Sequence, residues 1–124
     1  MTMQSKVFLK GDEMKWEELG GGVSRQIMGF NPQIMMVKVK FNKGSVGSPH
    51  QHFHSQATYV ASGKFEFTIG EEKTTITQGD AVYIKPNIMH SALCLEEGIL
   101  IDVFSPVRED FLDGSAVSYF GDKK

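Results

Sequence analysis

The sequence contains a single cysteine, Cys94, so no disulfide can form within the chain. Its apolar runs are short, and none approaches the roughly eighteen residues that a membrane-spanning helix needs. The N-terminus also lacks the basic start and apolar run of a secretory signal. We therefore expect a cytoplasmic protein with no membrane partner.

An excess of either charge is absent as well. The chain has 13 lysines and arginines against 15 aspartates and glutamates, which gives a formal net charge of −2. The two signs are interspersed, whereas nucleic acids and anionic lipids usually bind basic patches. We therefore expect no nucleic-acid partner. The 124 residues are enough for one domain with a hydrophobic core of its own.

Helical periodicity is scarce, and only residues 108–112 could form a helical turn. Thirteen glycines instead separate short runs in which every second residue is apolar. Many short strands with almost no helix are typical of an all-β sandwich or barrel. The expected strands are residues 35–41, 64–69, 73–77, 81–84 and 98–106. The side chains expected to face inward are Met35, Val37, Val39, Phe41, Phe65, Phe67 and Ile69, with Met36, Lys38 and Lys40 facing outward.

The first part of the chain shows weaker patterns. An apolar run at residues 7–9 predicts either a local edge strand or a strand that pairs with a second copy of the chain. The glycines at residues 20–22 indicate a tight turn rather than a phosphate loop, because the GxxxxGK[ST] spacing and a following helix are missing. We divide the chain into an N-terminal edge-strand and turn segment at 1–22, a barrel core at 24–105 and a C-terminal segment at 106–124.

Histidine is the informative residue type. Three of the four histidines, His50, His52 and His54, alternate within five residues. Every second side chain of an extended strand lies on the same face, so two imidazoles can converge on one point. This is the arrangement in which a strand supplies two nitrogen ligands to a metal ion. The alternative is a polar, solvent-exposed strand whose histidines bind nothing.

The residues around the histidines extend this pattern. Gly44 is followed after five residues by His50-x-His52, after three more by Gln56 and after six more by Gly63. This spacing resembles the first motif of the cupin superfamily, G(x)5HxH(x)3,4E(x)6G, with Gln56 in place of glutamate. The resemblance implies a single-domain double-stranded β-helix, the jelly-roll barrel of the cupins.

The second cupin motif, G(x)5PxG(x)2H(x)3N, is matched in part. Gly79 and His90 keep the separation of that motif. Pro86 comes one residue late, the glycine after it is missing, and Cys94 occupies the asparagine position. We expect Cys94 to be a small buried residue.

The resemblance implies that His50, His52, Gln56 and His90 bind one metal ion. His50 and His52 are then expected on one strand, Gln56 at the start of the next and His90 on a distant strand. Three imidazoles and an amide oxygen suit a divalent transition metal such as Ni, Zn, Fe, Mn or Co. A rival register pairs His52 with His54, but Gln56 would then follow the second histidine too closely for the motif. We interpret His54 as a turn or cavity residue.

Gln56 also changes the charge expected at this site. A glutamate would reduce the net charge of a divalent site to about +1, whereas four neutral ligands leave the full charge of the ion. We expect the ion to be held less tightly and to attract an anionic ligand more strongly.

A carboxylate interrupts the most apolar strand of the chain, at residues 98–106. Alternation places Asp102 on the same face as Phe104, and a charge in such a strand usually has a partner or a task. If that face is the interior of the barrel, Asp102 can act as a general acid or base near the metal. The alternatives are an ion pair with Arg25 or Arg108, or an outward-facing edge position.

Arg108 follows this strand, just beyond Pro106. It could fold back over the mouth of the barrel and bind a substrate carboxylate with two parallel hydrogen bonds. The alternative is a solvated charge beside Glu109 and Asp110.

A narrower resemblance covers nearly the whole chain. The segments GGGVSRQIMGF, PHQHFHSQATYVASGKFEFTIG and GILIDVFSPVREDFL are similar to the KdgF group of small cupins, which act in pectin and alginate breakdown. The resemblance implies conversion of 4,5-unsaturated monouronates to the linear 4-deoxy-5-keto-uronate. It also implies functional roles for Gln56, Asp102, Phe104 and Arg108, whereas Phe53 and Ser55 depart from that group.

The resulting hypothesis is a metal-dependent enzyme for a small anionic sugar. Asp102 would move the proton that opens the ring and later protonates the enol carbon. Arg108 would hold the substrate carboxylate, and Phe104 would shape the pocket. The alternatives are a metal-dependent dioxygenase for a small phenol or diketone, and a non-catalytic cupin that only binds a sugar acid. As in many small cupins, we expect a homodimer.

Overall fold

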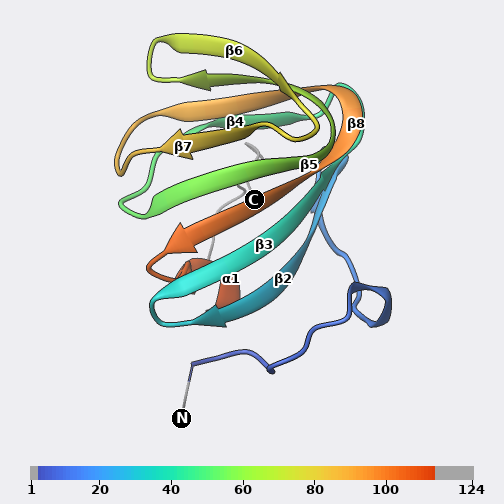
Figure 1. Ribbon diagram of the computed structural model, residues 1–124, viewed down its shortest axis with the longest axis vertical. Coiled ribbons are helices and arrows are strands. Elements are labelled where there is room, and N and C mark those ends of the chain that lie inside the picture. Colours follow the sequence, from blue (N-terminus) through green and yellow to red (C-terminus); the bar gives the residue numbers. More distant parts are fainter. Residues whose placement is uncertain (1–2, 114–124) are drawn as a thin grey trace.

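The computed structural model describes residues 3–113, which form an antiparallel β-sheet folded into two layers, with one short helix (Figure 1). The all-β prediction is confirmed. None of the described helices is long and apolar enough to cross a membrane. The elements are η1 (Gly11–Glu13), β1 (Glu17–Gly20), β2 (Val23–Asn31), β3 (Ile34–Phe41), β4 (Val46–His50), β5 (Ser55–Ile69), β6 (Glu72–Thr77), β7 (Ala81–Ile84), β8 (His90–Ser105) and α1 (Glu109–Asp113).

Two long strands, β5 and β8, connect the layers. They pair antiparallel along most of their length, and both bend midway (Figure 1). The first half of β5 pairs with β7 and the second half with β6. The first half of β8 pairs with β4 and the second half with β3. The bend therefore brings strands that are distant in sequence around one interior.

Glycine is required where the two paired long strands bend together. Gly63 has a φ of +88°, and a Cβ there would lie 2.6 Å from the carbonyl oxygen of Glu97. A Cβ on Gly98 would collide with the carbonyl oxygen of Ser62. The ladder between β5 and β8 shifts register at the same place. The last glycine of the first motif, Gly63, is therefore required because a side chain would collide with the neighbouring strand.

The core follows the predicted alternation. Its inward-facing side chains on β3 and β5 are buried, apart from Ile69, which is half-buried and packs against the cluster. Cys94 is fully buried, as expected. The buried side chains from these predictions are Met35, Val37, Val39, Phe41, Phe65 and Phe67.

The N-terminal segment differs from the expected local edge strand. Residues 7–9 form no strand in the described chain, and Val7 and Phe8 are 87 % and 83 % exposed. One backbone hydrogen bond joins this segment to β2, from the N–H of Ser5 to the carbonyl of Phe30. The edge strand is instead β1, and the glycines that follow form its turn into β2, as expected. Pairing of residues 7–9 with a second copy stays a prediction.

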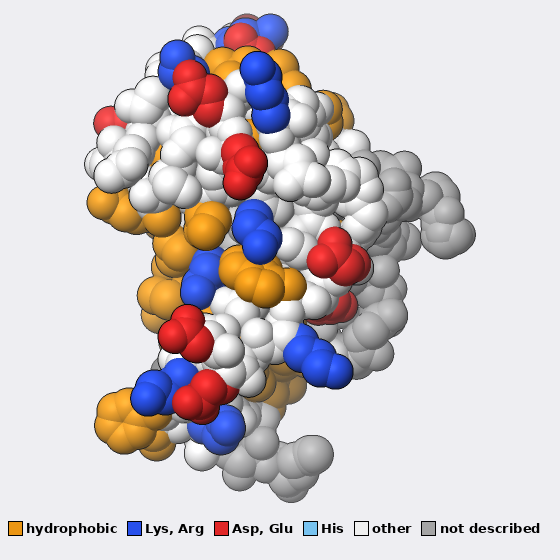
Figure 2. All heavy atoms as spheres, turned by 90° about the vertical axis from the view of Figure 1, so that its right-hand side faces the viewer, with side chains coloured by type: hydrophobic (Ala, Val, Ile, Leu, Met, Phe, Trp, Pro, Cys, Tyr) orange, Lys and Arg blue, Asp and Glu red, His pale blue; other side chains and the backbone are white. Residues whose placement is uncertain are grey.

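The surface carries mixed charge and one apolar face. Figure 2 shows lysine, arginine and acidic side chains intermingled, while hydrophobic side chains gather along its left-hand edge, the side that faces the viewer in Figure 1. Strands β3, β8, β5 and β7 lie there, and their outward residues pair across the strands in rows. We call this set the outer apolar face; it comprises Ile34, Met36, Ala57, Tyr59, Tyr83, Ile101 and Val103.

Candidate functional site

Three of the predicted ligands meet where β4 ends and β8 begins. His50 and His90 are direct partners in the β4–β8 ladder, and their ring centroids lie 4.3 Å apart. The ring of His52 lies 5.6 Å from that of His50 and 5.0 Å from that of His90. The prediction that His50 and His52 lie on one strand is wrong, because β4 ends at His50 and the chain turns there towards β5. The turn nevertheless brings the ring of His52 to the same point.

The imidazole nitrogens are arranged as metal ligands. One nitrogen from each ring, His50, His52 and His90, lies within 4.8 Å of the others. The Nδ1 atoms of the three rings contact the carbonyl oxygens of Ser48, His54 and Ile88 at 2.8, 3.2 and 3.0 Å, respectively. A carbonyl can only accept, so each Nδ1 carries the hydrogen and each Nε2 keeps its lone pair. Such outer hydrogen bonds are what orients histidine ligands in metal sites.

Gln56 adds an oxygen to this cluster. Its Oε1 lies 3.0 Å from Nε2 of His52, and its Nε2 donates to Thr58 at 2.9 Å. With Nδ1 of His52 protonated, both atoms of the 3.0 Å contact are acceptors, and a cation is what satisfies two converging acceptors. Nε2 of His90 is also buried, without a hydrogen-bond partner among the described residues. The four side chains therefore fit a divalent transition metal.

Burial keeps these imidazoles neutral at pH 7. Burial is the main reason that the pKa of His50 falls to about 4, and the hydrogen bond to Ser48 only partly opposes it. Burial and then the charge of Arg108 lower the pKa of His52 to about 4. Burial likewise lowers the pKa of His90 and of His54. Neutral imidazoles are the form that binds metal.

Asp102 faces the interior, as alternation predicted. It is 4 % exposed, and its Oδ1 accepts a hydrogen bond of 2.7 Å from the hydroxyl of Thr58. It lines a small cavity of about 30 Å³ together with Gln56, His50 and His90. The alternative of an outward-facing edge position is wrong. The carboxylate thus approaches the histidine cluster from inside the barrel.

Thr58 was not anticipated from the sequence. The signal was available, because Gln56 was expected at the start of a strand, and Thr58 follows it by two residues and so shares its face. A hydroxyl at a core position of a strand must find a hydrogen-bond partner. Thr58 finds two, since it accepts from Gln56 and donates to Asp102.

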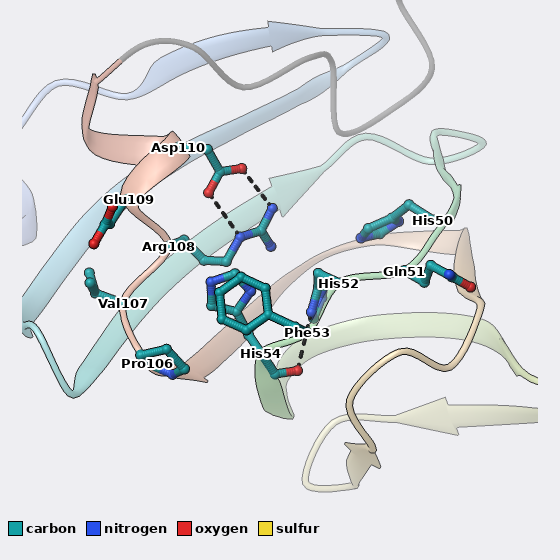
Figure 3. A pocket seen from close by; sticks show the side chains of 10 residues that line it. All are labelled: His50, Gln51, His52, Phe53, His54, Pro106, Val107, Arg108, Glu109 and Asp110. Atoms are coloured by element: carbon teal, nitrogen blue, oxygen red, sulfur yellow. Dashed lines mark hydrogen bonds and ion pairs between the residues drawn. The ribbon is translucent and has the colours of Figure 1, made fainter.

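Arg108 lines a larger pocket, of about 520 Å³, on the other side of the histidines (Figure 3). Its Nε and Nη2 donate to the two carboxylate oxygens of Asp110 at 3.1 and 2.9 Å. Its guanidinium also lies over the rings of Phe104 and Phe111. The alternative of a solvated charge is wrong, because Arg108 is only 6 % exposed. The pocket is lined by His50, Gln51, His52, Phe53, His54, Pro106, Val107, Arg108, Glu109 and Asp110.

Asp110 is the second residue near the site that the pattern did not single out. Burial raises the pKa of its carboxyl, but the hydrogen bond and the charge of Arg108 outweigh burial and lower it. Asp110 is therefore ionised at neutral pH and holds the Arg108 guanidinium in place. The ion pairs of the described chain also give Arg25 its own carboxylate, that of Glu17 at 2.9 Å.

Phe104 is fully buried behind the histidines. Its ring lies 5.8 Å from that of His52 and 6.4 Å from that of His54, in edge-on arrangements. Because Arg108 lies over the same ring, Phe104 supports the pocket wall from behind. A direct contact with substrate stays a prediction.

His54 lies in the wall of the larger pocket. Its ring stacks on that of Phe53 at 4.0 Å, and Figure 3 shows the two overlapping rings below Arg108. The cluster of converging ligand nitrogens comprises His50, His52 and His90 and leaves His54 out. This position agrees with the cavity role interpreted for His54.

Comparison with known proteins matches this geometry. Residues 37–104 match the family model described as Cupin domain. The chain is 50% identical over 103 residues to the pectin degradation protein KdgF of Dickeya dadantii, an alignment that covers 82% of this chain and 94% of the relative.

Two solved structures have the same fold. An RmlC-like cupin from Shewanella frigidimarina is 44% identical, with a TM-score of 0.85 over 87% of this chain and 97% of its own. The KdgF of a Halomonas species is 39% identical, with a TM-score of 0.83 over 86% of this chain and 99% of its own. The cupin fold inferred from the two motifs is confirmed. The chain therefore belongs to the cupin family, within the group of small cupins that includes KdgF.

Proposed function

We propose that this protein is a metal-dependent enzyme that converts 4,5-unsaturated monouronates to the linear 4-deoxy-5-keto-uronate. The observation that carries the proposal is the convergence of three imidazoles and one amide oxygen at a pocket that also presents a buried arginine. The kinship with a pectin degradation protein supports a uronate as the substrate class.

The proposed metal ligands are His50, His52, Gln56 and His90. When bound, a divalent ion of Ni, Zn, Fe, Mn or Co supplies a Lewis acid that stabilises negative charge developing on a substrate oxygen. All four ligands are neutral, so the site keeps a positive charge that favours an anionic sugar. Arg108 adds a guanidinium on the pocket side, whose charge the carboxylate of Asp110 balances.

The residues of the chain divide the remaining tasks. Asp102 takes the proton of the anomeric hydroxyl, and a carbonyl forms at C1. The bond between C1 and the ring oxygen then breaks, and the electron pair of that bond stays on the ring oxygen, which becomes the oxygen of an enolate. Asp102 then returns the proton to C4, which yields the ketone without any redox partner. Arg108 binds the substrate carboxylate, and Asp110 keeps its guanidinium oriented. Phe104 closes the pocket from behind.

The decisive experiment follows the conjugated alkene of the substrate. The protein is incubated with unsaturated galacturonate or mannuronate monomers, with and without a chelator, and the loss of absorbance is recorded. We expect a rate well above the uncatalysed one that the chelator abolishes and added metal restores. A rate equal to the uncatalysed one overturns the proposal. Oxygen uptake during turnover would instead indicate a dioxygenase.

We also propose a homodimer and a cytoplasmic location. The outer apolar face offers four paired strands of outward hydrophobic side chains, including Met36, Tyr59 and Tyr83, which are 42–65 % exposed. A small groove of about 200 Å³ lies within the same face. A contiguous exposed apolar face of this kind usually marks a protein interface.

A further inference from the structure

We propose that Thr58 is a positioning residue, which determines the end of the Gln56 carboxamide that faces the metal. This inference rests on the proposed metal site and deepens it. Thr58 touches neither the pocket nor the predicted ion. It acts through two hydrogen bonds, one to Gln56 and one to Asp102.

A carboxamide ligand raises a problem that a carboxylate does not. The two ends of the Gln56 side chain are nearly equal in size, but only the oxygen can bind a cation. If the amide rotated by half a turn, its NH₂ group would point at the imidazoles and would exclude the ion. A glutamate at this position would offer an oxygen in either orientation.

The hydrogen of Thr58 decides the orientation. The hydroxyl has one hydrogen, and the buried carboxylate of Asp102 accepts it at 2.7 Å. Only the lone pairs of Oγ1 then remain for Gln56, and lone pairs require a donor. The NH₂ end of Gln56 meets that requirement at 2.9 Å, so its Oε1 must point towards Nε2 of His52.

The relay is built into the sheet and closed to water. Gln56 and Thr58 share a face of β5, two residues apart, and Thr58 is directly opposite Asp102 in the ladder with β8. Their exposed fractions are 5 %, 1 % and 4 %, respectively. Because bulk water cannot replace a lost partner at such depth, removal of the hydroxyl leaves the amide without a fixed orientation.

The first test measures Co²⁺ binding in the absence of substrate. Thr58→Val removes the hydroxyl at nearly constant volume, Thr58→Ser keeps it, and Thr68→Val changes a threonine elsewhere on β5. We expect Thr58→Val to weaken Co²⁺ affinity about tenfold or more in competition with a chelator, and to alter the visible absorption of bound Co²⁺. Thr58→Ser and Thr68→Val should keep the affinity within about threefold and leave the spectrum unchanged.

The second test is a double-mutant cycle with Gln56→Glu. In that background either oxygen of residue 56 can bind the ion, so Thr58→Val should weaken Co²⁺ affinity by less than about threefold. An equal loss in both backgrounds would assign Thr58 a general packing role and overturn the inference. So would a Thr58→Val protein with unchanged affinity and spectrum. If the unaltered protein binds no Co²⁺, the proposed metal function fails first; the two failures are thus distinguishable.

Discussion

A single side chain, Gln56, sets the charge of the site, because it is the amide counterpart of the usual cupin glutamate. We predict that Gln56→Glu binds a divalent ion more tightly, by about tenfold, since the carboxylate removes one positive charge from the site. Calorimetric titration of Co²⁺ or Ni²⁺ into both proteins measures the difference. Equal or weaker binding by the variant would remove the charge argument.

A substitution of Asp102 can separate proton transfer from metal binding. We predict that Asp102→Asn lowers turnover of an unsaturated uronate by about 10² to 10⁴-fold, because the amide can neither take nor return the proton. The metal content, measured by elemental analysis, should be retained, since the Asn oxygen can still accept from Thr58. Full activity in this variant would contradict the proposed mechanism.

At the scale of elements, the backbones of β5 and β8 approach each other closely where both strands bend. We predict that Gly98→Ala lowers the free energy of unfolding by about 2–4 kcal/mol, because its methyl group would meet the backbone of Ser62. Gly44→Ala is the matched control, since its φ is +87° but its Cβ would meet open space. That control should cost about 1 kcal/mol from backbone strain alone. Urea unfolding distinguishes the two, and equal losses would contradict the steric account.

The connection between β4 and β5 makes the metal-free protein sensitive to acid. His50 and His52 have pKa values of about 4, below the ordinary 6.5, so the unfolded chain binds more protons between these values. Stability is therefore complete above pH 6.5 and falls as the pH drops towards 4. We predict that the free energy of unfolding falls by about 2 kcal/mol over this window. This is less than the two pKa shifts would give for fully buried rings, because both rings are partly exposed.

Thermal unfolding of the chelator-treated protein across pH 4 to 7 measures this loss. The variant with both His50 and His52 replaced by glutamine is the control and should show a flatter profile. A melting temperature of the unaltered protein that stays constant through the window would contradict the prediction.

At the scale of the whole molecule, the outer apolar face predicts self-association. Met36, Val103, Ala57 and Tyr83 form one continuous row across four strands, so a second copy could bury them together. We predict that light scattering finds a dimer and that Tyr83→Glu converts it to a monomer. Val46→Glu changes an exposed apolar residue on β4, in the other layer, and should leave the dimer intact. A monomeric unaltered protein would contradict the expectation.

The fold was largely accessible from local pattern. The alternation around Val37 and Phe67 identified the inner face of the sheet, because successive side chains of a strand point to opposite faces. The apolar run at residues 7–9 suggested a local edge strand that does not form, since hydrophobicity alone does not show whether another strand lies close enough to pair with it. The length of β5 and β8 was also not predicted. Both strands continue through a glycine, Gly63 or Gly98, where a break was expected.

Motif spacing was enough to predict the cupin family and the convergence of His50, His52, Gln56 and His90, because such spacing reports a geometry that recurs across a fold. The hydrogen bonds that serve those ligands could be identified only in the folded chain. Thr58 meets Asp102 across 44 residues of chain, because β5 and β8 pair in that register. Such pairings depend on how two strands lie in register, and a spacing along one chain carries no record of that register.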